Sequence, residues 1–219
     1  MATKGRKMGV LANGSSWRVW RAAVLTLSIS LAASPSLAVE DRDEWQQPDR
    51  VMQDLGIKPG ASVADIGCGE GYFTFRLGQA VGEHGKVFAV EVSEAPLKTI
   101  RQRIQREQLA NIKTVLSKSP NTGLPAESCD AALLCNMLHE VPQGQRLPLV
   151  QDVGTLRPGS FLFVIEWQVS CEVRSDRDER CVSREDLVKL GTNAGLSRDA
   201  EFHYLKHQVF LRFRNPVQP

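Results

Sequence analysis

Short apolar runs alternate along the chain with segments whose apolar residues recur at helical spacing. The runs at 61–66, 86–91, 112–116, 130–135 and 161–165 are typical of buried strands, and 200–204 with 208–213 is typical of a hairpin. Helices are predicted near 49–55, at 72–81, after a cap at Ser93, and from a cap at Ser183 to a stop at Gly195.

One more helix is predicted before the most apolar strand. Leu149, Val150, Val153 and Leu156 recur at helical spacing, and the proline and glycine of Arg157–Gly159 are predicted to end that helix.

Strands that alternate with helices indicate βαβ units. The sequence therefore predicts an α/β fold: a doubly wound, mostly parallel, seven-stranded sheet with helices on both faces and a C-terminal antiparallel hairpin. In such sheets a ligand binds beyond the carboxyl ends of the strands, where the strand order reverses. We expect residues 39–219 to form one domain.

The first 38 residues differ in composition from the rest of the chain. Five basic and no acidic residues occur there, and the mostly apolar run 22–33 precedes the small-residue segment Ser36-Leu37-Ala38. This order is typical of a signal peptide cleaved after Ala38, which would make the protein exported or periplasmic. A mitochondrial transit peptide and a membrane anchor are the alternatives, although 12 residues are too few to span a bilayer core of about 30 Å.

Removal of this leader would change the charge of the protein. The 219-residue chain has 27 Lys and Arg against 25 Asp and Glu, a net charge of +2. Without the five basic residues of the leader, 22 basic residues remain against 25 acidic ones, a net charge of −3. A domain without a basic surplus does not attract polyanions, so no nucleic-acid partner is expected. A hydrophobic share of 42% excludes the disordered class.

The five cysteines are too few for a disulfide scaffold in a chain of this length. Cys68, Cys129 and Cys135 lie in or beside apolar runs and are predicted to be buried. Cys171 and Cys181 flank a charged stretch that is predicted to be a surface loop, and a bridge between them is expected only in an exported protein. These two cysteines with His203 and His207 fit no common zinc spacing, so no metal is expected.

A glycine-rich loop follows the first strand, in the segment Asp65-Ile-Gly67-Cys68-Gly69-Glu-Gly71-Tyr72. Glycines allow a sharp turn and a close approach between backbone and ligand. A dinucleotide site would need its third glycine at position 72, and the Gly-Lys-Ser/Thr of a phosphate loop is absent. Glu91 ends the second strand, where a carboxylate can accept from both hydroxyls of a ribose. Asp65 and Glu91 together predict a pocket for a nucleoside with a cationic, unphosphorylated tail.

Four segments in this order resemble motifs of the class I S-adenosylmethionine-dependent methyltransferases, a Rossmann-like family: 63–74, 86–91, 130–136 and 156–166. The resemblance covers nearly all of residues 39–219. It implies methylation with S-adenosyl-L-methionine as the cofactor. The resemblance further implies that the glycine loop holds the methionine part, that Asp65 helps bind the ammonium group and that Glu91 binds the ribose. The cofactor-binding residues so implied are Asp65, Gly67, Cys68, Gly69, Gly71, Tyr72, Glu91 and Asn136.

One feature departs from this family. Many members have an acidic residue after the third strand that binds the adenine amino group, but the segment 116–125 has none. Ser117, Ser119 and Asn121 are the candidates for this contact.

The chemistry of methyl transfer requires positioning and, for some acceptors, a base. His139 follows the fourth strand and is the candidate catalytic base, while packing and capping is the equally open alternative. Glu166 and Trp167 end the fifth strand at the same rim and are candidates for contact with the acceptor. Trp45 is a candidate lid, but ordinary packing is favoured for both tryptophans.

The acceptor is expected to be a small molecule or a protein. A signal peptide would carry the enzyme away from the cytosol, where its cofactor is made. Two alternatives follow: an exported, methyltransferase-like binding protein that retains the nucleoside pocket without turnover, and an enzyme that acts in an organelle or at a membrane.

Overall fold

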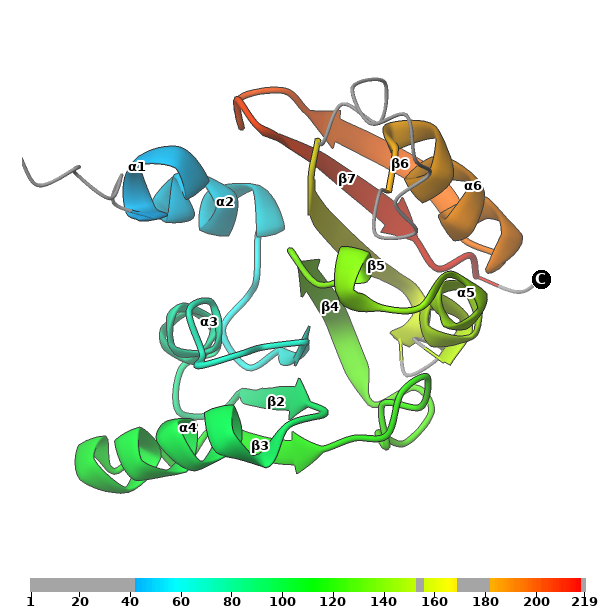
Figure 1. Ribbon diagram of the computed structural model, residues 1–219. Coiled ribbons are helices and arrows are strands. Elements are labelled where there is room, and N and C mark those ends of the chain that lie inside the picture. The colour runs from blue at the N-terminus through cyan, green and yellow to red at the C-terminus, as the bar shows by residue number, and fades with distance from the viewer. Residues whose placement is uncertain (1–41, 153–155, 169–181, 218–219) are drawn as a thin grey trace, which may run out of the picture. The chain divides into compact units, whose positions relative to one another are not determined.

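Seven strands form one sheet in the order β3-β2-β1-β4-β5-β7-β6, which confirms the predicted fold class (Figure 1). Strands β1 to β5 are parallel, and β7 runs antiparallel to both β5 and β6. The strands are β1 (Ser62–Ile66), β2 (Lys86–Glu91), β3 (Ile112–Leu116), β4 (Cys129–Cys135), β5 (Leu156–Trp167), β6 (Ser197–Phe202) and β7 (Gln208–Arg214).

The computed structural model describes residues 42–152, 156–168 and 182–217. The predicted leader, 1–38, and the charged loop between Cys171 and Cys181 lie outside the described residues. No helix in the described part of the chain is long and apolar enough to cross a membrane.

Helices cover both faces of the sheet (Figure 1). Side chains from α2, α3 and α4 share one buried cluster with one face of the strands, and side chains from α5 and α6 share a second cluster with the other face. The helices are α1 (Arg42–Gln46), α2 (Pro48–Leu55), α3 (Thr74–Val81), α4 (Glu94–Glu107), the 3₁₀ turn η1 (Leu138–Glu140), α5 (Gln143–Asp152) and α6 (Arg184–Asn193).

The predicted end of the fifth helix is wrong. Helix α5 ends at Asp152, and Leu156 to Gly159 belong to β5, where Leu156 pairs with Cys129 of β4. The register of this pairing shifts between Cys129 and Ala131, so Pro158 lies where the ladder is irregular and its missing N–H costs little. Leu149 and Val150 lie buried in α5 as predicted, Val153 lies outside the described residues, and Leu156 is buried in the sheet.

The predicted helix caps are confirmed in part. Ser183 accepts a hydrogen bond from the backbone N–H of Asp186, whose side chain accepts from the backbone of Ser183, a complete capping box. Ser93 occupies the position before α4, but its side chain makes no capping hydrogen bond.

The strand order reverses between β1 and β4, because β2 and β3 lie on one side of β1 while β4, β5, β7 and β6 lie on the other. Connections leave these two strands over opposite faces of the sheet, so their carboxyl ends open a crevice. This crevice is the place where the predicted site residues gather.

Two helical glycines provide a matched test of packing. A Cβ added at Gly191 of α6 would lie 2.6 Å from Cδ1 of Phe213, and closer still to Cε1, in a buried ring. A Cβ added at Gly144 of α5 would meet no atom within 4 Å.

We predict that Gly191→Ala lowers the free energy of unfolding by about 1–3 kcal/mol, because the extra methyl overpacks the core. Gly144→Ala should leave it unchanged or raise it by up to about 0.5 kcal/mol, because alanine favours the helix. Denaturant unfolding measures both values, and equal effects of the two substitutions would contradict this packing.

Candidate functional site

A cavity of about 1420 Å³ opens at the carboxyl ends of β1, β2 and β4. The glycine loop, Glu91, the segment after β3, the end of β4 and residues of α1 line it. Glu166, which was predicted at the same rim, does not border this cavity. The predicted cofactor-binding residues and the candidate base all do: Asp65, Gly67, Cys68, Gly69, Gly71, Tyr72, Glu91, Asn136 and His139.

The glycine loop presents its backbone to the cavity. The N–H groups of Gly67 and Cys68 both donate to the carbonyl of Val90, which fixes the loop against the end of β2. Gly67 has φ +69°, and a Cβ there would lie 2.8 Å from Cβ of Met137. Gly69 has φ +52° and open space where a Cβ would be, so a ligand can approach this backbone closely.

Asp65 is a buried carboxylate below the loop, with a residue exposure of 3%. Its Oδ2 accepts a hydrogen bond of 2.6 Å from the hydroxyl of Thr74 in α3. Burial raises the pKa of Asp65 to about 6, while the hydrogen bond from Thr74 and the charge of Arg42 act in the opposite direction. A carboxylate that lacks full compensation for its burial favours a cationic partner.

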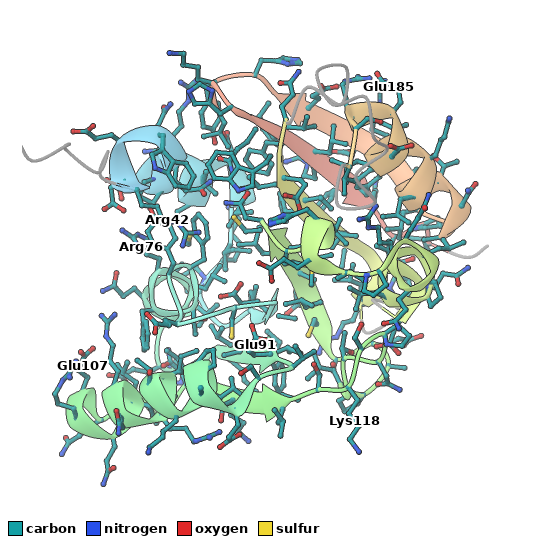
Figure 2. All side chains as sticks on the ribbon, viewed as in Figure 1. Arg42, Arg76, Glu91, Glu107, Lys118 and Glu185 are labelled. Atoms are coloured by element: carbon teal, nitrogen blue, oxygen red, sulfur yellow. The ribbon has the colours of Figure 1, made fainter. Side chains whose placement is uncertain are left out.

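Glu91 lies at the end of β2 and accepts backbone hydrogen bonds on both oxygens (Figure 2). Oε2 accepts from Gly69 at 3.1 Å, and Oε1 accepts from Val92 at 2.7 Å and from Ser93 at 3.2 Å. A carboxylate has about four lone-pair positions, and these three bonds leave one free position, on Oε2. The side chain is therefore held in place and keeps an acceptor position on Oε2 for a ribose hydroxyl.

The segment after β3 brings Ser117, Ser119 and Asn121 to the cavity wall. The Ser119 hydroxyl donates to the side chain of Gln145 at 3.1 Å, and the Asn121 side chain accepts from the backbone of Gly123 at 2.7 Å. All three candidates for the adenine contact thus border the cavity.

Helix α1 is tied to α3 by a cluster of polar and aromatic contacts. Asp43 accepts from the Tyr72 hydroxyl at 2.5 Å and from Arg76 at 2.9 Å. The guanidinium of Arg42 lies 3.6 Å from the centroid of the Tyr72 ring (Figure 2). Among the described residues, the buried Nε of Arg42 has no hydrogen-bond partner.

Three side-chain amides form a hydrogen-bonded ring, of which only Asn136 borders the cavity. Gln46 donates to Gln208 at 3.0 Å, Gln208 donates to Asn136 at 2.5 Å, and Asn136 donates back to Gln46 at 3.2 Å. Gln46 and Gln208 are buried. The Asn136 side chain is therefore engaged in joining α1 to the ends of β4 and β7, although the residue borders the cavity.

His139 is held by Glu166, whose side chain is only 1% exposed. Nδ1 of His139 lies 2.8 Å from Oε1 of Glu166, which also accepts the backbone N–H of Trp167 at 2.9 Å. Trp167 and Trp45 both border the cavity, with ring centroids 4.7 Å apart. Trp45 thus packs against Trp167 at the cavity, and its role as a lid stays a prediction.

Sequence patterns missed three contributors to this site: Arg42, Gln46 and Gln208. Arg42 borders the cavity, whereas Gln46 and Gln208 hold the side chain of Asn136 at its edge. Contacts between distant parts of the chain place all three, and no local motif marks such residues. Within the described ranges, no group of three or more His, Cys, Asp or Glu side chains is placed to hold a metal ion.

Comparison with known proteins agrees with this geometry. Residues 63–159 match the family model described as a methyltransferase domain. A demethylmenaquinone methyltransferase of Geobacillus stearothermophilus is 30% identical over 123 residues, 56% of this chain and 51% of that protein. The chain spans about half the length of the curated relatives it matches.

Solved structures share the fold. A structure titled as a SAM dependent methyltransferase from Aquifex aeolicus has a TM-score of 0.71 at 23% identity, over 80% of this chain and 92% of that one. The [4+2]-cyclase SpnF has a TM-score of 0.66 at 16% identity, over 79% of this chain and 81% of that one. The chain therefore has the class I, Rossmann-like methyltransferase fold, as its four sequence motifs predict.

Asp65 makes the stability of the ligand-free protein depend on pH. The pKa of Asp65 is about 6 in the folded protein, against an ordinary value of 3.8 for an aspartate side chain in water. The folded state therefore holds the proton more tightly than the unfolded state. The free energy of unfolding therefore falls as pH rises from about 4 to about 6 and stays low above that range.

We predict that Asp65→Asn removes this fall. From pH 4 to pH 7, the unfolding free energy of the wild type should fall by about 2–3 kcal/mol relative to that of the variant. Denaturant unfolding at the two pH values measures the shift, with the exposed Glu83→Gln as the control. If the unfolding free energies of wild type and Asp65→Asn changed with pH by the same amount, Asp65 would not be a buried carboxylate that lacks full compensation.

Proposed function

We propose that the protein is an S-adenosylmethionine-dependent methyltransferase and that the cavity at the ends of β1, β2 and β4 binds the cofactor. The observation that carries the proposal is the position of Glu91 and Asp65 on either side of the glycine loop. One carboxylate is held ready for a ribose diol, and the other is buried and lacks a full counter-charge. The methyltransferase-domain match supports the same function.

The residues at the cavity fit this cofactor. The open space at Gly69 admits the methionine chain beside the backbone. The free position on Oε2 of Glu91 accepts one ribose hydroxyl, and the other hydroxyl can replace the 3.2 Å bond from Ser93 on Oε1. Ser117, Ser119 and Asn121 are placed for the adenine ring. When bound, S-adenosylmethionine supplies a methyl group already activated on a sulfonium.

Arg42 and Asp65 complete the fit at the amino-acid end of the cofactor. An α-amino acid carries an ammonium and a carboxylate, and the cavity offers a buried carboxylate together with a guanidinium whose charge already acts on it. The unpartnered Nε of Arg42 is a donor that a carboxylate would satisfy. We therefore assign the ammonium to Asp65 and the carboxylate to Arg42.

The protein's own contribution to methyl transfer is mainly positional. The glycine loop and Glu91 fix the nucleoside, and the packed pair Trp45 and Trp167 forms an aromatic part of the cavity wall. Methyl transfer needs the acceptor atom in line with the breaking bond, so such fixed walls lower the entropic part of the barrier.

Isothermal titration with S-adenosylmethionine tests the proposed function directly. We predict binding by the wild type, and a Kd raised about 10–100-fold by Glu91→Gln, because a neutral amide loses hydrogen bonds to the two ribose hydroxyls. Glu94→Gln, a nearby carboxylate that does not border the cavity, is the control. An absence of binding by a folded wild type would refute the function.

The assignment of Arg42 has its own test. We predict that Arg42→Met weakens S-adenosylmethionine binding about 10–100-fold, because the charge-assisted contact to the carboxylate is lost. The affinity for 5′-methylthioadenosine, which has no amino-acid end, should stay within about twofold. Arg50→Met is the control, since Arg50 stacks on Tyr204 outside the cavity lining. Equal weakening of both ligands would contradict the assignment.

A further inference from the structure

Glu166 fixes the proton of His139 on one ring nitrogen. The Glu166 side chain is 1% exposed, and its Oε2 also accepts the backbone N–H of Leu138 at 2.9 Å. A carboxylate in this setting acts only as an acceptor, so Nδ1 of His139 is the donor across the 2.8 Å contact. In a neutral imidazole the other nitrogen, Nε2, then carries the lone pair.

The lone pair of Nε2 is available to a molecule in the cavity. His139 borders the cavity, and Oε1 of Glu140 lies 3.9 Å from Nε2, beyond hydrogen-bond distance. The charged groups that face the ring are therefore the buried Glu166 on Nδ1 and the exposed Glu140 near Nε2. An imidazole whose Nδ1 is held by a carboxylate and whose Nε2 is open has the arrangement of a positioned base.

The wall beside this base is aromatic. Trp167 directly follows Glu166 and packs against Trp45, and both rings border the cavity. Neither ring is fully buried, so flat apolar surface remains exposed to the cavity. Such surface favours a planar ring as its partner.

We propose that His139 is the general base for the methyl acceptor, that Glu166 is its positioning residue, and that the acceptor is a planar aromatic compound with a hydroxyl group. This rests on the proposed function of the same site. A carboxylic acid is already ionised near pH 7 and a neutral amine already has its lone pair, whereas a phenolic hydroxyl, with a pKa of about 10, gains most from a base.

The acceptor O–H bond breaks and its proton goes to Nε2 of His139. The oxygen electron pair forms the bond to the methyl carbon of the sulfonium co-substrate. The carbon–sulfur bond breaks with its pair on sulfur, which leaves a neutral thioether and an imidazolium paired with Glu166.

A matched series of naphthalenes tests the acceptor class on the full chain. The probes are 2-naphthol, 2-naphthylamine and 2-naphthoic acid with S-adenosylmethionine, and the measured quantity is the release of S-adenosylhomocysteine. We expect 2-naphthol to be methylated in preference to the other two. Preference for the amine or the acid, or methylation of none by a protein that binds the cofactor, would overturn the assignment.

Variants test the base. We expect His139→Asn to lower kcat for 2-naphthol by about 100-fold or more, while the Kd for S-adenosylmethionine stays within about twofold. His84→Asn, an exposed histidine between α3 and β2, is the control. Unchanged kcat in His139→Asn would show that His139 only packs.

A spectroscopic readout separates positioning by Glu166 from a purely structural role. We expect ¹⁵N NMR of the ligand-free wild type, recorded at a pH where the ring is neutral, to show the His139 proton on Nδ1. Glu166→Gln keeps the shape but introduces an N–H donor, so we expect a mixture of tautomers and a kcat about tenfold lower, with cofactor affinity retained. An unchanged tautomer would overturn the positioning role.

Failure of the proposed function and failure of the acceptor and base assignments give different results. If the folded wild type does not bind S-adenosylmethionine, the proposed function itself is wrong. If it binds the cofactor while 2-naphthol is not preferred or His139 is dispensable, only the acceptor and base assignments are wrong.

Discussion

The reversal of strand order between β1 and β4 is the constraint on which the rest of this site depends. Because the chain leaves these two strands over opposite faces of the sheet, their carboxyl ends cannot be covered by the same connection. The crevice that remains receives the glycine loop from β1, the carboxylate of Glu91 from β2 and the turn after β4. Each of these groups is placed by its strand and needs no long-range contact to reach the cavity.

The opposite wall depends on contacts between distant segments. Helix α1 is only five residues long, and it is held by Asp43 against α3 and by Gln46 against Gln208, a residue 162 positions away. The same helix carries Arg42 and Trp45 to the cavity. The groups that we propose to hold the nucleoside are thus placed by strand ends, whereas Arg42 at the proposed amino-acid end and Trp45 on the proposed acceptor side are placed by tertiary contacts.

This difference explains what the sequence could and could not predict. The alternation of apolar runs with helical periods predicts the fold class, and the glycine loop with Glu91 predicts the nucleoside side, because these features follow from local sequence. Arg42, Gln46, Gln208 and the pairing of His139 with Glu166 could not be predicted, because each depends on which segments meet in space. The predicted helix end at Arg157–Gly159 was wrong because proline and glycine also suit an irregular strand, and pairing with β4 determines which occurs.

The central claim is that Glu91 and Asp65 define the two ends of one S-adenosylmethionine site. A crystal structure of the protein with S-adenosylhomocysteine tests it most directly. The account predicts both ribose hydroxyls within hydrogen-bond distance of the Glu91 carboxylate, and the amino-acid end between the glycine loop, Asp65 and Arg42. A nucleoside whose ribose lies away from Glu91, or whose amino-acid end points away from Asp65, would contradict it.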